Sequence, residues 1–95
     1  MSKEQEILDF LHAQVFDHII DSPHASQALK QGVRLTIMRL ERLDALGMVK
    51  YYWSAISGTE RSTEFARLME TEGFTRFEEV TDDFSNRFND QWLNT

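Results

Sequence analysis

The chain of 95 residues contains no cysteine, a single proline and four glycines. Without cysteine it can form no disulfide, and it offers no thiolate as a metal ligand or nucleophile. No stretch approaches the roughly 20 apolar residues of a membrane span, and the N-terminal sequence MSKEQEILDF lacks the apolar run of a signal peptide. We therefore expect a cytoplasmic protein with a single domain over residues 1–95.

Charge is distributed unevenly along this acidic chain, whose formal net charge is −6. Residues 1–26 hold one basic and five acidic side chains, a net of −4. Residues 27–50 hold five basic and two acidic side chains, a net of +3, and residues 51–95 hold four and nine, a net of −5. The basic middle can pair with its acidic neighbours within the fold, or it can meet an acidic partner.

Apolar residues recur at steps of three and four over the first 20 residues, which predicts an amphipathic helix of about five turns. Ser2 and Gln5 match a capping box at its start. The helix is expected to stop near Pro23, which lacks an N–H group and disfavours helical geometry at Ser22. Ser22 as N-cap and Pro23 at the first helical position then predict the start of the next helix.

Residues 33–56 are apolar on nearly all sides of a helix. One face carries Val33, Ile37, Leu40 and Tyr51, and the opposite face carries Leu35, Leu43, Leu46 and Trp53. A helix with two apolar faces must be covered on both sides, so we expect it in the centre of a bundle, with a break near Gly47. Residues 48–56 also alternate like a strand, but no second strand candidate exists to pair with them.

Residues 51–95 contain the signals for the remaining helices. A loop is predicted at residues 57–59, capping boxes begin at Ser57 and Thr75, and Gly73 is expected to stop a helix. A further apolar stripe with acidic residues opposite it consists of Phe77, Val80, Phe84, Phe88 and Trp92. The predicted fold class is all-α, a small bundle of four or five helices with a central two-faced helix over residues 33–56.

The chain lacks the usual signatures of catalysis and cofactor binding. His12, His18 and His24 are six residues apart, whereas metal ligands on one helix need spacings of three or four. Neither G-x-x-x-x-G-K-[ST] nor G-x-G-x-x-G is present. The acidic pairs at residues 78–79 and 82–83 fall on the expected solvent face, where water keeps both members ionised. We expect a protein that is not an enzyme and that uses no metal, cofactor or small-molecule substrate.

Residues 23–61 allow a nucleic-acid hypothesis. A short helix, Gly32, and a longer helix with Arg34, Arg39 and Arg42 resemble a helix-turn-helix. The continuation to residue 61 looks like the end of a recognition helix that runs into a wing, as in winged-helix regulators. The resemblance implies a DNA-binding regulator whose arginines contact phosphate. The net negative charge opposes a DNA-binding face, so this function is the alternative.

Consecutive aromatic residues at positions 51–53 favour a protein-contact function. On a helix the first and third of them point about 160° apart, so at least one should meet a second surface. The predicted partner-binding residues are Tyr52, Trp53, Arg34, Arg39 and Arg42, which combine the residue types that dominate interface hot spots. The favoured function is a small regulatory or adaptor module that binds a protein partner, with a homodimer possible. A third hypothesis is that the acidic C-terminal face mimics nucleic acid and occupies a basic protein.

Overall fold

The structure is a computed structural model that describes residues 2–56, 71–74 and 77–95. Within these ranges the chain forms helices and no strand, which confirms the predicted all-α bundle. None of the described helices is both long and apolar enough to cross a membrane. The elements are α1 (Lys3–Leu11), η1 (His12–Phe16), α2 (Asp17–Ile20), α3 (Gln27–Leu40), α4 (Ala45–Tyr51), η2 (Tyr52–Ile56), α6 (Phe77–Arg87) and α7 (Asp90–Leu93).

The N-terminal run from α1 through η1 to α2 is one continuous helical segment, as the apolar periodicity predicts. Ser2 caps it by accepting a hydrogen bond from the Gln5 backbone N–H at 3.1 Å. The Gln5 side chain donates instead to Asp9, at 2.8 Å from Nε2 to Oδ1. The π-helical turn η1 interrupts the α-helical pattern, because the Asp17 N–H donates to the carbonyl of His12, five residues earlier.

The start of α3 differs from the prediction, because Ser26 and not Ser22 is its N-cap. The Ser26 Oγ accepts from the Leu29 N–H at 3.1 Å, and Ser26 itself has extended backbone geometry. Ser22 accepts a hydrogen bond from the His24 N–H at 3.2 Å, which uses its hydroxyl inside the connecting turn. Residues 21–26 are thus needed to reverse the chain between α2 and α3, a requirement that Pro23 alone does not reveal.

Residues 33–56 form α3 and the following helices with a break, as predicted, but the break lies at residues 41–44 and not at Gly47. α3 continues through Gly32 and ends at Leu40, and Asp44 starts α4 by accepting a hydrogen bond from the Gly47 N–H at 2.8 Å. Gly47 therefore lies inside α4, where a Cβ would sit 3.0 Å from the Asp44 Oδ1. The preference for helix over strand in residues 48–56 is confirmed, since they form the end of α4 and η2.

The C-terminal stripe also breaks, at Asn89. Its side chain accepts from the Trp92 N–H at 2.9 Å and caps α7, so Trp92 belongs to a separate short helix. Gly73 lies in a turn with a φ of 87°, a conformation that glycine adopts without strain. The predicted loop at residues 57–59 and the starts of both C-terminal capping boxes lie outside the described residues.

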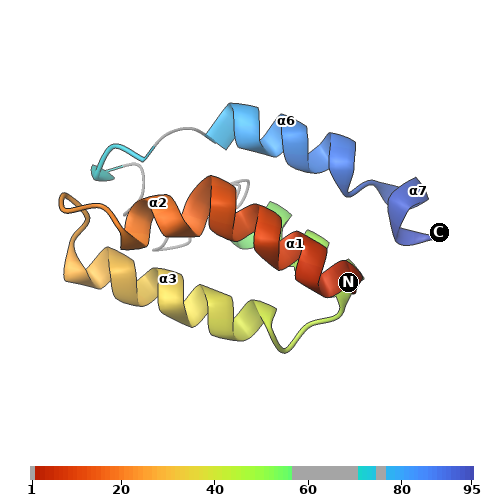
Figure 1. Ribbon diagram of the computed structural model, residues 1–95, viewed down its shortest axis with the longest axis horizontal. Coiled ribbons are helices and arrows are strands. Elements are labelled where there is room, and N and C mark those ends of the chain that lie inside the picture. The colour runs from red at the N-terminus through yellow and green to blue at the C-terminus, as the bar shows by residue number, and fades with distance from the viewer. Residues whose placement is uncertain (1, 57–70, 75–76) are drawn as a thin grey trace.

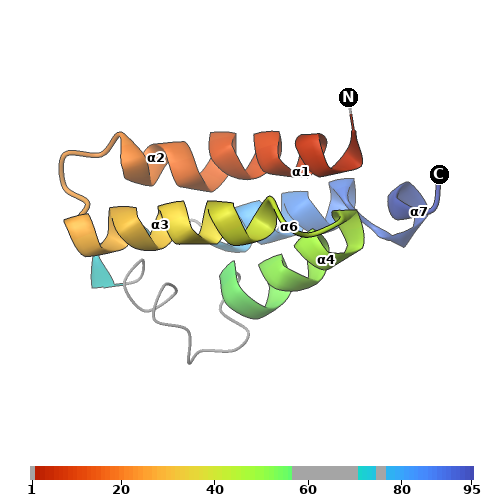
Figure 2. The ribbon, with the colours of Figure 1, turned by 90° about the horizontal axis from the view of Figure 1, so that it is seen from below.

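In the view of Figure 1 the N-terminal run lies between α3 and α6. α1 packs against α4, and α2 packs against α3. In the turned view, α3 runs in front of α6, with the N-terminal run on one side and α4 on the other (Figure 2). This arrangement gives α3 and α6 one inward face each and leaves their other faces to solvent.

Phe84 of α6 is the centre of an aromatic cluster that joins the elements. Its ring stacks on Tyr52 at a centroid distance of 3.9 Å, and it meets Phe10 edge to face at 5.8 Å. Phe88 lies 5.0 Å from Phe84 and 5.4 Å from Phe10. These contacts tie α1, η2 and α6 together through geometries that stabilise aromatic pairs beyond the area they bury.

Candidate functional site

The inner face of α3 contributes to the core and thereby fixes which residues of this helix face outward. Leu29, Val33 and Leu40 are fully buried, at the spacing of one helical face. Thr36 is buried on the same face, and its hydroxyl donates to the Gly32 carbonyl at 2.8 Å. With this face held against the bundle, the residues on the opposite side of α3 point to solvent.

Two large apolar side chains lie on that opposite side. Leu35 is 49% exposed and Met38 is 53% exposed. Because they are three residues apart on a helix, their Cβ atoms are neighbours, about 5–6 Å apart. They therefore form one apolar patch on the surface and not two scattered side chains.

Arginines flank this patch on both sides. At about 100° per residue, Arg34 and Arg39 project about 70° to either side of the line between Leu35 and Met38. Arg42 follows in the turn after the helix, and all three arginines are exposed. We call Arg34, Leu35, Met38, Arg39 and Arg42 the α3 outer surface.

The α3 outer surface is basic because the helix supplies no compensating acid. α3 contains no acidic residue, and Glu41 at its C-cap is the nearest one in the sequence. Within the described part of the chain, none of the three arginines forms an ion pair or a hydrogen bond through its side chain. The surface therefore presents apolar area between two unneutralised positive charges.

Tyr52, a predicted partner-binding residue, lies in the core. Its side chain is completely buried against Phe84, and its Oη lies 2.9 Å from the Thr81 Oγ1, within hydrogen-bond distance. Burial raises the pKa of the Tyr52 hydroxyl above its ordinary value, and the hydrogen bond with Thr81 acts in the opposite direction. In this arrangement Tyr52 is not accessible to a partner.

Trp53 is half-buried and belongs to the same aromatic cluster. Its ring lies 5.5 Å from Tyr52 and 6.3 Å from Phe84 between centroids, both edge to face. The five predicted residues thus separate into two groups. Arg34, Arg39 and Arg42 are exposed on and just after α3, whereas Tyr52 and Trp53 pack beside α6.

Leu35 and Met38 are absent from the predicted partner-binding residues. A sequence signal for Leu35 exists, because it belongs to the second apolar face of residues 33–56. The sequence predicts that the bundle covers this face, but its α3 portion is open to solvent. Leu46, at the start of α4, is 50% exposed and comes from the same face.

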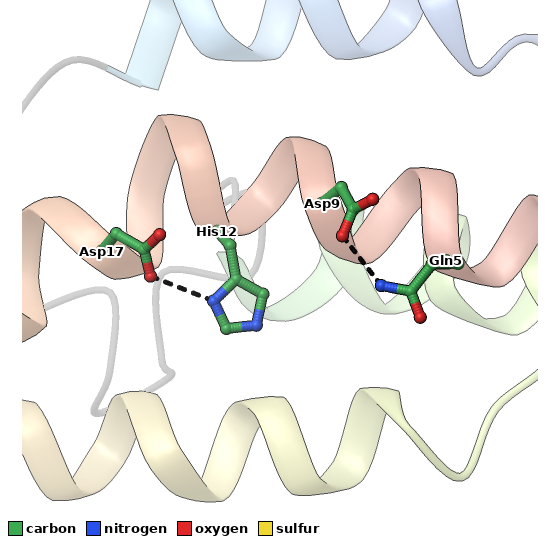
Figure 3. A network of polar contacts seen from close by, with 4 residues as sticks. All are labelled: Gln5, Asp9, His12 and Asp17. Atoms are coloured by element: carbon green, nitrogen blue, oxygen red, sulfur yellow. Dashed lines mark hydrogen bonds and ion pairs between the residues drawn. The ribbon is translucent and has the colours of Figure 1, made fainter. Parts of the chain in front are cut away.

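Of the three histidines, His12 takes part in a local polar contact on the N-terminal run. His12 Nδ1 and Asp17 Oδ1 lie 3.1 Å apart, and Gln5 binds Asp9 nearby on the same run (Figure 3). The π-helical turn η1 brings His12 and Asp17 together, since residues five apart would diverge on an α-helix. Both side chains are substantially exposed, so the pair contributes little to stability.

A small hollow lies between the N-terminal run and α6. Its lining residues are Gln14, His18, Glu79, Val80 and Asp83, and its volume is about 70 Å³. Among the described residues, no three histidines or carboxylates are grouped closely enough to hold a metal ion. The hollow therefore contacts solvent through a few polar side chains, and its described residues do not form a metal site.

Comparison of the chain with protein-family models, with curated proteins and with solved structures finds no match. The candidate site consequently rests on the geometry of this chain alone, and the α3 outer surface is the feature that the fold itself does not require.

Proposed function

We propose that this protein is a small, non-enzymatic regulatory or adaptor module that acts in the cytoplasm by binding another protein through the α3 outer surface. The observation that carries the proposal is the exposed pair Leu35 and Met38 between two arginines. Single exposed apolar side chains are common on protein surfaces, whereas contiguous exposed apolar area with a polar rim marks interaction sites as that area grows.

A partner that covers the α3 outer surface would remove apolar area from water, which favours binding. Fully burying a leucine or methionine side chain contributes about 1.5–3 kcal/mol. Leu35 and Met38 are each about half exposed, so covering both would contribute about 2 kcal/mol in total. Arginine is also enriched at interface hot spots, because its guanidinium forms several directed hydrogen bonds. The α3 outer surface therefore combines an apolar centre with specific polar anchors.

The helix-turn-helix alternative depends on a turn near Gly32. α3 is continuous from Gln27 to Leu40 and passes through Gly32, so the described part of the motif has a different geometry from the one proposed. The residues of the proposed wing, 57–61, lie outside the described residues. The three arginines can still contact phosphate, and the experiment therefore includes nuclease treatment.

The test compares capture of proteins from native lysate by the wild-type chain and by Leu35→Gln. We expect the variant to lose a partner that the wild type retains after nuclease treatment, because a polar side chain removes the apolar centre of the contact. Leu46→Gln is the matched control, since Leu46 is the same residue type at nearly the same exposure on α4. Equal capture by all three chains would contradict the proposal, and material lost on nuclease treatment would favour nucleic acid.

A further inference from the structure

We infer that the α3 outer surface binds an acidic amphipathic helix of a different protein. The inference rests on the proposed function and specifies its partner. It follows from the position of the arginines, from the poor match of this surface to a second copy of itself, and from the character of the chain's own acidic face.

The spacing of the patch suits a helix as its occupant. Leu35 and Met38 are three residues apart and correspond to the core positions of a helix pair, while Arg34 and Arg39 take the flanking positions. Helices pack with their axes about 8–10 Å apart, a distance that the flanking side chains of both helices can span. A partner helix with apolar residues at steps of three and four would cover the patch. Glutamates or aspartates beside those residues would then reach Arg34 on one side and Arg39 on the other.

A second copy of this chain does not complement the surface. Because both flanks of the patch are arginine, two copies facing each other place arginine against arginine whether the helices run parallel or antiparallel. Such a contact would gather six arginines from Arg34, Arg39 and Arg42, and Glu41 would supply only two carboxylates. Like charges this close oppose association.

The chain's own acidic helix does not complement the surface either. Glu79, Asp82 and Asp83 are exposed on α6, whereas Val80 and Phe84 of the same helix, and Phe88 just after it, are buried. Docking α6 of one copy on α3 of another would cover Leu35 and Met38 with carboxylates, which would lose their water without an apolar gain. In the part of the chain that the structure describes, the exposed large apolar side chains are Leu35, Met38 and Leu46, and none of them lies on an acidic helix. We therefore infer that the partner, which must carry acidic and exposed apolar residues together, is a different protein.

The test uses two synthetic peptides designed as amphipathic helices. Both have leucines at i, i+3, i+4 and i+7, and the flanking positions are glutamate in one peptide and lysine in the other. Fluorescence anisotropy titrations should show the glutamate peptide binding about tenfold more tightly, the expected sum of several exposed ion pairs. Arg34→Glu combined with Arg39→Glu should invert this preference. Lys50→Glu, a charge reversal at an exposed position of α4, should leave it unchanged.

Several results would overturn the inference. Equal binding of the two peptides, or binding of neither, would exclude the acidic helix as occupant. A dimer in sedimentation equilibrium that Leu35→Gln dissociates would assign the surface to a second copy. Duplex DNA binding that Arg39→Glu abolishes would assign it to nucleic acid. If lysate capture depends on Leu35 while the glutamate peptide fails, the protein-contact function stands and only the nature of the partner is wrong.

Discussion

α3 and α6 are both amphipathic helices, and in the view of Figure 1 they flank the N-terminal run. Their inner faces are alike, since each supplies fully buried apolar side chains to one core. Their outer faces differ. The described outer residues of α6 are mainly acidic and polar, whereas α3 exposes Leu35 and Met38 between arginines.

The difference separates the residues that build the fold from those available for contact. Solvent hydrates the carboxylates of α6 fully, so its outer face needs no partner. Water hydrates the arginines of α3 equally well. Exposure of the apolar side chains of Leu35 and Met38 to water, however, is unfavourable. We therefore attribute the inner faces of both helices to stability and the outer face of α3 to binding.

The largest expected effect is on the inner face of α6. Phe84→Ala should lower the free energy of unfolding by about 3–5 kcal/mol, because it leaves a cavity at the centre of the aromatic cluster. Urea denaturation followed by circular dichroism measures this change. A loss below about 1 kcal/mol would contradict the central position of Phe84. Phe84→Leu, which keeps most of the volume, should cost less than Phe84→Ala.

A smaller effect is expected at the joint between α3 and α4. Asp44→Ala removes the acceptor for the Gly47 N–H and should cost about 1 kcal/mol. Asp44→Asn keeps an N-cap acceptor and serves as the matched control in the same denaturation experiment. Equal stability of the Ala and Asn variants would show that the cap does not hold α4 in place.

The start of α3 should be sensitive to pH through Glu72. Its carboxylate accepts hydrogen bonds at 2.6 Å from both the Ser26 hydroxyl and the Ser26 backbone N–H. These two hydrogen bonds hold the pKa of Glu72 below its ordinary value of 4.5, and the bond from the Ser26 hydroxyl has the larger effect. Folding therefore favours the ionised form, and this contribution to stability is present above about pH 4.5 and is lost as the pH falls through the lowered pKa.

Denaturation over a series of pH values should show this loss in the wild type and less of it in Glu72→Gln, which cannot ionise. Glu79→Gln removes an exposed carboxylate on α6 and provides the control. If wild type and Glu72→Gln lose stability in parallel below pH 4.5, the contact between Glu72 and Ser26 does not stabilise the fold.

The smallest effect is expected on the outer face of α3. Leu35→Ala and Met38→Ala should each change the free energy of unfolding by no more than about 0.5 kcal/mol, since both side chains are half exposed and alanine favours helix. Thermal denaturation of both variants measures this change, and Phe84→Ala, measured in the same way, provides the large loss for comparison. A loss of about 2 kcal/mol in either variant would place these residues in the core and remove the distinction between the two faces of α3.

Much of the fold could be predicted from local patterns. Apolar residues at steps of three and four over residues 3–20 and 77–88 predict the N-terminal run and α6 together with their buried faces. They do so because the side of a surface helix that faces the core is apolar and repeats with the helical period. The boundary between α3 and α4 was missed for a physical reason. Asp44 interrupts an apolar face in the sequence, but its role is to cap the next helix through a short hydrogen bond.

The candidate site could be predicted only in part. Arg34, Arg39 and Arg42 stood out by charge, and Leu35 stood out as part of a second apolar face. Which apolar face is covered depends on how distant segments pack, and this information is not local. Tyr52 shows the same limit, since its burial follows from the stack on Phe84, 32 positions later in the chain.

The most direct test of the account places a photoreactive amino acid at position 35 of α3 or, in a separate chain, at position 82 of α6. Both positions are exposed, and neither substitution removes a core side chain. After irradiation in native lysate, we predict a protein adduct of defined mass from position 35 and none from position 82. The same adducts from both positions, or none from position 35, would contradict the claim that the outer surface of α3 is where this protein meets its partner.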